Sequence, residues 1–142
     1  MSAAHAGGGS VFARIVAGEI PCHRVFENDQ VLAFLDISPL AEGHTIVIPK
    51  RAVERFEDLS PEEAAELGRQ LVVIARKIAA ATGAPGYNIL QNNGRVASQE
   101  VPHVHFHIIP RREGDGLGYR WRPQKRSSEE LAALAERIRS QR

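Results

Sequence analysis

The stretch His103-Val104-His105-Phe106-His107-Ile108-Ile109-Pro110 places a histidine at every second position of one short apolar run. Alternation is the period of a β-strand, so we expect the three imidazoles to project from one face. Val104, Phe106 and Ile108 would then pack into the core on the other face. Imidazole is the side chain that titrates closest to neutrality, and three aligned rings do not serve packing. The pattern therefore predicts that the chemistry of the chain lies on this strand.

The segments around this run carry alternating strand and helix signals. Apolar, β-prone segments predict four further strands, at 23–26, 31–36, 44–48 and 87–91. Ser60-Pro61-Glu62-Glu63 predicts the start of a long helix, because serine caps, proline suits the first turn and Glu63 completes a capping box. Helical spacing continues to Gly83, and short helices are expected at 11–17 and from Ser127. This order predicts an α+β fold, an antiparallel sheet with one long helix on one face.

Length and composition are those of one soluble globular domain. The chain has 142 residues and a formal net charge of +1, so no strong global field selects nucleic acid or a membrane. Cys22 is the single cysteine, which excludes an intramolecular disulfide framework and an all-cysteine zinc site. Residues 1–9 lack the apolar stretch of a signal peptide, and no run is long enough to span a bilayer. We expect a cytoplasmic protein with a flexible leader over residues 1–10.

The segment after the histidine run is locally basic. Its cations are Arg111, Arg112, Arg120, Arg122, Lys125 and Arg126. Such a segment can steer an anionic substrate toward the histidines, or it can be a solvated basic tail. Both interpretations stay open on the sequence.

Three aligned imidazoles permit two kinds of chemistry. Neutral imidazole is a good nucleophile at phosphorus, and His105 has a histidine on either side to bind phosphate oxygens or orient its ring. Alternatively, an alternating pair of histidines can chelate zinc, copper or iron with a carboxylate or third histidine nearby. A polar face that is merely rich in histidine is the structural alternative.

The run resembles the histidine triad (HIT) signature, His-x-His-x-His followed by apolar residues. The resemblance extends from Val11 to Tyr119, through the segments Phe12–Pro21, Leu32–Pro39 and Gly43–Lys50. It implies a HIT domain over 11–119, a basic tail with a short helix over 120–142, and a homodimer whose sheets join across a two-fold axis. In the HIT family of nucleotide hydrolases and transferases the triad acts on phosphorus and does not form a catalytic metal centre.

The resemblance also assigns roles to individual residues. His105 matches the nucleophile that forms a nucleotidyl-histidine intermediate, His103 and His107 match the flanking members that orient it and hold the phosphate, and His44 matches a fourth histidine. Asp36 matches the acidic residue on the ribose hydroxyls. The matches to the apolar walls of the base pocket are Phe12, Ile15, Ile20, Phe34 and Ile37, and Asn92 matches a polar side chain near the phosphate.

The chain also departs from the family pattern. Ser10 and Ala13 stand where many bacterial members have the Cys-x-x-Cys of a structural zinc site, so we expect no zinc. Glu100 stands where the phosphoramidase branch commonly has serine, and a carboxylate there would repel phosphate unless it points away or is protonated. Gln99 is the expected phosphate-side hydrogen-bond donor. Trp121 in the tail is a candidate for contact with an active site, including that of a partner subunit.

Together these observations predict an enzyme that cleaves or transfers at the α-phosphorus of a purine nucleotide conjugate. The conjugate is a phosphoramidate or a dinucleoside polyphosphate, and Mg²⁺ can assist a polyphosphate leaving group although no cofactor is required. Two other functions remain: a non-catalytic nucleotide-binding or signalling module on the same scaffold, and a strand-borne histidine metal site.

Overall fold

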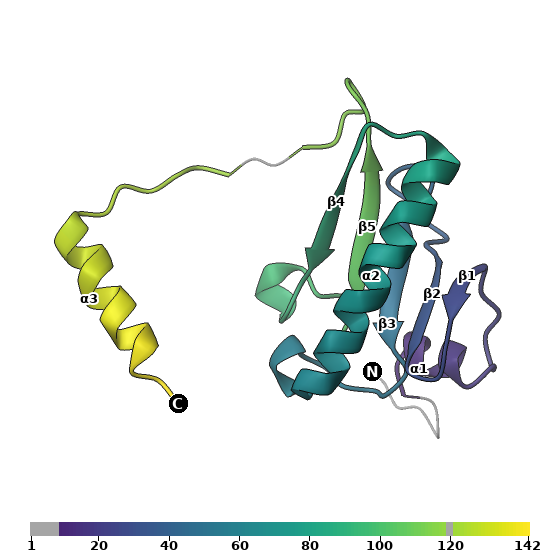
Figure 1. Cartoon of the computed structure of the whole chain (residues 1–142), viewed down its shortest axis with the longest axis horizontal. Coiled ribbons are helices and arrows are strands. Elements are labelled where there is room, and N and C mark those ends of the chain that lie inside the picture. The colour runs from purple at the N-terminus through teal and green to yellow at the C-terminus, as the bar shows by residue number, and fades with distance from the viewer. Residues whose placement is uncertain (1–8, 119–120) are drawn as a thin grey trace.

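The computed structural model describes residues 9–118 and 121–142 of the chain; most of the predicted leader lies outside them. The helices are α1 (Val11–Val16), α2 (Pro61–Thr82) and α3 (Ser128–Arg139). The strands are β1 (Arg24–Glu27), β2 (Val31–Leu35), β3 (Thr45–Pro49), β4 (Gly86–Gln91) and β5 (Phe106–Arg111). They form one sheet in the order β1-β2-β3-β5-β4, and every neighbouring pair is antiparallel (Figure 1). The predicted α+β fold is confirmed.

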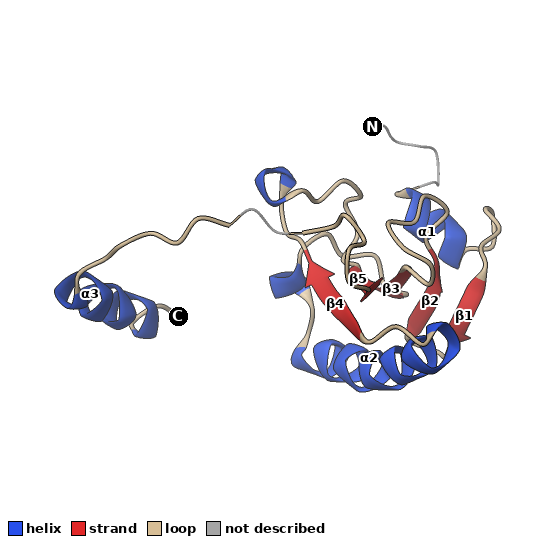
Figure 2. Ribbon diagram, turned by 90° about the horizontal axis from the view of Figure 1, so that it is seen from above, coloured by secondary structure: helices blue, strands red, loops and turns tan. Residues whose placement is uncertain are grey.

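The two faces of the sheet are covered by different helices (Figure 2). Along β2, Val31 and Ala33 belong to the core that α2 buries, whereas Leu32 and Phe34 pack on the opposite face with Phe12 of α1. This is the two-residue period of a strand that is buried on both faces. The face that α1 covers is therefore apolar, but the short α1 covers less of it than α2 covers of the other face. The histidines His44, His105 and His107 lie on the α1 side.

Helix α2 begins and ends where its sequence predicts. The Ser60 hydroxyl accepts the Glu63 amide hydrogen at 3.0 Å, and the Glu63 carboxylate accepts the Ser60 amide hydrogen at 2.9 Å, which completes the capping box. Gly83 ends the helix in the left-handed region with φ of 66°. The buried stripe of the helix, which packs on the sheet, consists of Leu67, Leu71, Ile74, Ala75 and Ile78.

The strand predicted from His103 is wrong at its start, since β5 begins at Phe106. The His103 amide donates to the Val101 carbonyl at 2.8 Å, a tight turn around Pro102, and the Val104 amide donates to Val53 outside the sheet ladder. Pairing with β3 starts only at Val47 opposite Phe106. Phe106 and Ile108 do face the α2 core as predicted.

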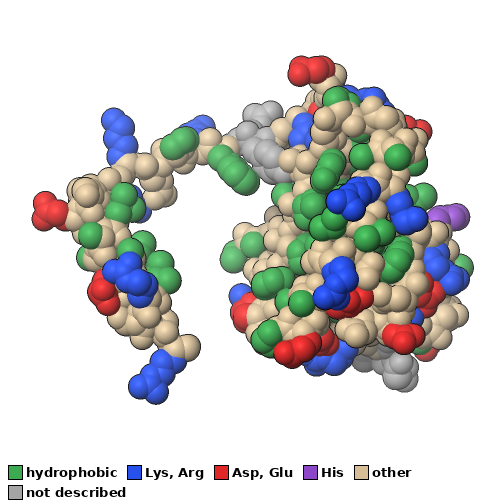
Figure 3. Space-filling model, in the orientation of Figure 1, with side chains coloured by type: hydrophobic (Ala, Val, Ile, Leu, Met, Phe, Trp, Pro, Cys, Tyr) green, Lys and Arg blue, Asp and Glu red, His purple; other side chains and the backbone are tan. Residues whose placement is uncertain are grey.

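The C-terminal tail leaves the sheet and ends in helix α3, which lies apart from the rest of the chain (Figures 1 and 2). Its predicted start is confirmed, because Ser127 and Glu130 form a second capping box. Hydrophobic and charged side chains share its surface (Figure 3), and Leu131, Leu134 and Ile138 are exposed. No helix among the described residues is long and apolar enough to cross a membrane.

Candidate active site

A pocket of about 470 Å³ opens on the face of the sheet that α1 covers. His44, His105 and His107 line it, together with the carboxylates of Asp36 and Glu100. All five apolar residues that the resemblance assigned to a base pocket also line it: Phe12, Ile15, Ile20, Phe34 and Ile37. The pocket thus joins an apolar slot to a polar end that carries the histidines.

The position of His105 is fixed by its own backbone neighbourhood. Its Nδ1 lies 2.8 Å from the carbonyl oxygen of His103, and because a carbonyl only accepts, Nδ1 carries the proton. The neutral ring therefore has its lone pair on Nε2. The Phe12 ring packs edge-on against His105 with ring centroids 5.0 Å apart, and His105 itself is 5% exposed. The site thus holds a neutral, partly dehydrated imidazole with one basic nitrogen.

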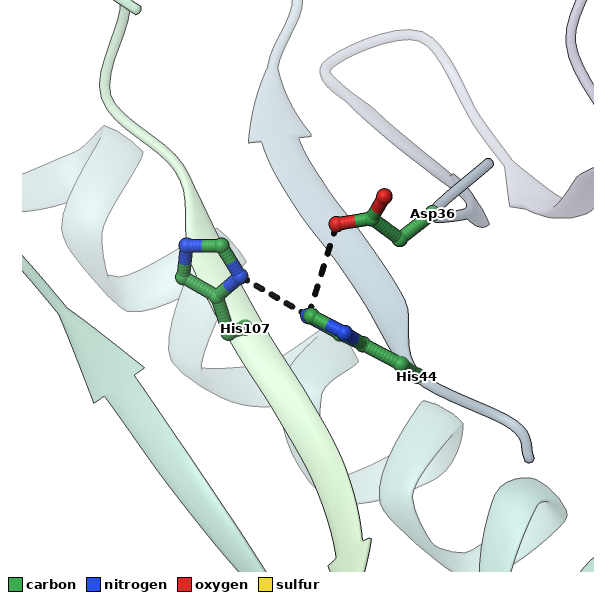
Figure 4. Close-up of side chains that lie close together, drawn as sticks. All are labelled: Asp36, His44 and His107. Carbon is green, nitrogen blue, oxygen red and sulfur yellow. Dashed lines mark hydrogen bonds and ion pairs between the residues drawn. The ribbon is translucent and has the colours of Figure 1, made fainter. Parts of the chain in front are cut away.

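His44 and His107 form a directed hydrogen-bond chain (Figure 4). The Leu40 amide donates to Nδ1 of His44 at 3.0 Å, so in the neutral ring the proton of His44 is on Nε2. This Nε2 lies 2.9 Å from Nδ1 of His107 and 3.6 Å from a carboxylate oxygen of Asp36. Nδ1 of His107 accepts this hydrogen bond from His44, so the neutral His107 ring carries its own proton on Nε2. A neutral donor is thereby placed beside His105, whose ring centroid is 5.0 Å away.

His103 supports the site from behind it and does not line the pocket. It is fully buried, and its Nε2 donates to the carbonyl of Pro49 at 2.8 Å. Its Nδ1 is a buried acceptor that has no hydrogen-bond partner among the described residues. His103 contacts His105 through its carbonyl oxygen, so its predicted part in orienting the His105 ring has a structural basis. Its predicted part in holding phosphate has none in this arrangement.

Burial lowers the pKa of every histidine of the cluster. The pKa of His107 falls to about 4, because burial and the nearby rings of His105 and His44 all disfavour its cation. Burial is also the largest cause for the lowered pKa of His44, His103 and His105. The charges of Asp36 and Glu100 oppose the effect at His105 without reversing it. The whole cluster is therefore neutral near pH 7.

This neutrality predicts that acid destabilises the fold. The unfolded His107 has a pKa of 6.5 and the folded one of about 4, so between these values the unfolded state binds more protons. The free energy of unfolding therefore rises with pH across this window and decreases as pH falls, by roughly 1–2 kcal/mol at pH 5. Urea titrations at pH 7, 6 and 5 measure it. His107→Asn should reduce the pH slope, and an equal slope in both proteins would contradict the assignment.

The loop before the triad corrects the expected role of Gln99. Its Nε2 donates to the carbonyls of Glu54 and Val101 at 2.7 and 3.1 Å, and its Oε1 accepts from the Gly94 amide at 2.8 Å. Because the amide hydrogens of Gln99 are bonded to these carbonyls and the residue is only 6% exposed, Gln99 holds the loop in place and does not donate to phosphate. Ser98, which the sequence reasoning missed, lines the pocket instead.

The remaining residues that the sequence singled out are Asn92, the basic segment after the histidine run and Trp121. Asn92 follows β4 and is not among the residues that line the pocket. Arg111 is at the opposite end of β5 from His107, where its guanidinium binds Asp115 at 2.7 Å, so it does not line the histidine pocket. Arg120 lies outside the described residues. Trp121 is 79% exposed and does not line the pocket of its own chain.

Asp36, His44 and His107 are also a candidate metal centre, since their ligand atoms lie within 4.8 Å of one another. A metal would need the lone pair of His44 Nε2. The Leu40 amide occupies Nδ1 of the same ring, which keeps the proton on Nε2. These three side chains therefore suit a chain of hydrogen bonds better than the binding of a metal ion.

Comparison with known proteins identifies the family. A sequence model of the HIT domain matches residues 17–114, and the chain belongs to the HIT domain family. It is 46% identical over 131 residues to a protein named adenosine 5'-monophosphoramidase hnt1 from Schizosaccharomyces pombe, covering 92% of this chain and 96% of that one. It is 41% identical over 107 residues to adenylylsulfatase HINT3 from Arabidopsis thaliana, covering 75% and 54%.

Comparison with solved structures leads to the same family. The crystal structure of a HIT family member from Bacillus subtilis superposes with a TM-score of 0.88 at 41% identity, covering 92% of this chain and 94% of that one. The predicted family and the HIT-like α+β fold are therefore both confirmed.

Proposed function

We propose that the protein is a hydrolase of nucleoside phosphoramidates that acts at the α-phosphorus. The observation that carries the proposal is the tautomer of His105. Its Nδ1 donates to the His103 carbonyl at 2.8 Å, and the ring lines the same pocket as His44, which is 61 positions earlier in the sequence. This arrangement offers Nε2 as a nucleophile. The relatives named as adenosine 5'-monophosphoramidase and adenylylsulfatase support an adenosine nucleotide.

The proposed reaction has two displacements at phosphorus. In the first, the lone pair of His105 Nε2 forms a bond to the α-phosphorus, and the bond from phosphorus to the amine nitrogen breaks. The electron pair leaves with the amine, which takes up a proton from solvent water. In the second, water attacks the phosphorus and releases a proton to solvent, the bond to His105 breaks, and the nucleoside monophosphate and neutral imidazole result. The proton on His107 Nε2 would bind a phosphate oxygen in both steps.

The nucleoside would occupy the apolar part of the pocket. Ile37 is 85% exposed, and a flat purine lying against it would cover apolar surface that is otherwise in water. Phe34, which is buried, also lines the pocket. The Asp36 carboxylate lines the pocket 3.6 Å from His44 and would accept hydrogen bonds from the ribose hydroxyls.

Turnover of adenosine 5'-phosphoramidate by the purified protein tests the proposal, with AMP and ammonia as products. We expect turnover to persist in EDTA, because every proposed step uses side chains of this chain. Elemental analysis of the same preparation addresses the metal alternative. Nucleotide binding without turnover would instead favour the binding module, and loss of activity on chelation, together with stoichiometric metal, would favour the metal site.

We also propose that the protein is a homodimer joined at β4. This strand is at the edge of the sheet, where one row of backbone groups has no strand partner among the described residues. Tyr87 and Ile89 on it are 45% and 44% exposed and share a face. A second copy of β4 would pair the backbone and cover both side chains, as the family resemblance implies.

Charge on this edge should separate the subunits. Ile89→Asp is expected to shift the protein from dimer to monomer in size-exclusion chromatography with light scattering, because burying a carboxylate in the interface costs several kcal/mol. Arg24→Asp places the same charge on β1, at the opposite edge, and should leave the mass unchanged. A wild-type monomer, or a dimer that survives Ile89→Asp, would contradict this interface.

The remaining expectations concern location and other partners. A cytoplasmic location agrees with the single cysteine, since reducing compartments do not favour disulfide frameworks. We propose no nucleic-acid or membrane partner, because the net charge of +1 provides little general attraction to polyanionic surfaces.

A further inference from the structure

Glu100 presents a carboxylate to the pocket from the loop before the triad. Ser98 and Glu100 line the pocket, while Gln99 between them is buried and bonded to the carbonyls of Glu54 and Val101. Ser98 has φ of 72° and is the non-glycine residue with positive φ among the described residues. The turn at Ser98 and the clamp at Gln99 together fix which side chains of this loop face the pocket.

The carboxylate of Glu100 has no structural partner that would explain it. It makes no hydrogen bond or ion pair with another residue in the part of the chain that the structure describes. It is nevertheless close enough to His105 to act on its charge. Glu100 is exposed and also lines the pocket, so its carboxylate is accessible both to solvent and to a molecule bound there. A charge in this position is available to a ligand.

The charge balance of the pocket indicates which ligand. The described residues that line it include two carboxylates, Asp36 and Glu100, and neither a lysine nor an arginine. Polyphosphate carries several negative charges, which proteins commonly neutralise with cationic side chains or a metal ion. An amine-linked monophosphate carries about one. The leaving group that such a pocket disfavours least is therefore neutral or cationic.

The two carboxylates reach the histidines from different elements. Asp36 follows β2 and lies 3.6 Å from His44, next to the apolar slot proposed for the nucleoside. Glu100 comes from the loop that leads into the triad. Because Asp36 is assigned to the ribose, Glu100 is the carboxylate of the pocket that remains for the leaving group.

We propose that Glu100 determines specificity for the leaving group: it selects nucleoside phosphoramidates whose amine carries a further positive charge, and it disfavours polyphosphate leaving groups. This inference rests on the proposed function and adds the class of amine to it. An ammonium near the carboxylate gains a partly exposed ion pair. A polyphosphate in the same place is repelled by the Glu100 carboxylate, and no lysine or arginine among the described residues that line the pocket neutralises its charge.

Two substrates of matched length test the selection. They are the adenosine 5'-phosphoramidates of 1,4-diaminobutane, which ends in an ammonium, and of n-pentylamine, which ends in a methyl group. We expect the wild type to show a kcat/KM ratio of roughly two to five in favour of the diamine conjugate, as an exposed ion pair gives. Glu100→Gln should bring this ratio to about one and increase the relative use of diadenosine tetraphosphate. The ratio cancels any loss common to both conjugates.

Matched controls separate this effect from general electrostatics. Glu62→Gln removes an exposed carboxylate from the first turn of α2, on the other side of the sheet, and should leave the ratio unchanged. Glu100→Asp keeps the charge and should keep a preference above one. Added salt should reduce the preference of the wild type but not the ratio of Glu100→Gln.

The outcomes distinguish this proposal from the function on which it rests. Turnover of both conjugates with a ratio that Glu100→Gln does not alter would overturn the role of Glu100 and leave the hydrolase in place. Absence of turnover on every phosphoramidate would overturn the proposed function, and the assignment of Glu100 with it. A wild-type preference for diadenosine tetraphosphate over both conjugates would overturn the charge selection directly.

Discussion

His105→Ala is expected to reduce turnover of adenosine 5'-phosphoramidate by at least about 10⁴-fold, the order of loss that accompanies removal of a covalent nucleophile. Alanine leaves the apolar walls and Asp36 in place, so the dissociation constant for AMP should change only a few-fold. Single-turnover experiments with rapid acid quench should show a nucleotidyl adduct on the wild type. Mass spectrometry should place it on the peptide that contains His105 and find none in the variant.

A histidine outside the site provides the control. His23→Ala removes an exposed imidazole just before β1 and is expected to retain full turnover. His105→Asn keeps a polar side chain but has no basic nitrogen, so it should be as inactive as the alanine variant. Turnover within tenfold of wild type in either His105 variant would contradict the assignment of His105 as the nucleophile. A nucleotidyl adduct on another histidine would assign that role to the other residue.

The sequence predicted most of the fold because its signals are local. The capping box at Ser60 and Glu63 and the left-handed Gly83 are made by neighbouring residues, and α2 begins and ends there. The boundary of β5 was not predictable in the same way. His103 and Val104 alternate as a strand would, yet the Val104 amide bonds to Val53, a loop residue 51 positions earlier in the sequence that no local pattern reveals.

The site divides along the same line. Alternation correctly predicted that His105 and His107 share a face, and the family resemblance placed the apolar residues of the pocket. The sequence could not show that Gln99 is bonded to the backbone through its whole amide group, because its partner Glu54 belongs to a different loop, 45 positions earlier in the sequence. The tautomers of His44 and His105 likewise depend on partners, and only the folded chain brings these partners together.

A long-range contact also underlies the largest expected effect on stability, at Gly43. Its φ is +89°, and a Cβ there would lie 2.6 Å from Cγ2 of Thr82 and 3.2 Å from Cγ of Pro110. Neither neighbour moves easily, since the Thr82 hydroxyl is bonded to the Ile78 carbonyl at 2.8 Å and Pro110 is a ring within β5. Gly43→Ala should destabilise the protein by roughly 2–4 kcal/mol, from backbone strain and overpacking together. Thermal unfolding should show Tm lowered by about 10 °C.

The two causes can be separated, because they act through different atoms. Thr82→Ser removes the Cγ2 methyl group but keeps the hydroxyl that bonds to Ile78. The double variant should therefore recover the overpacking part of the loss, roughly 1–2 kcal/mol, and retain the strain from the positive φ. Gly68→Ala is the control: its Cβ would meet nothing within 4 Å in the middle of α2, and the better helix former should raise Tm slightly. An unchanged Tm in Gly43→Ala would contradict this prediction, because it would show that Thr82 and Pro110 can move to make room for a Cβ at position 43.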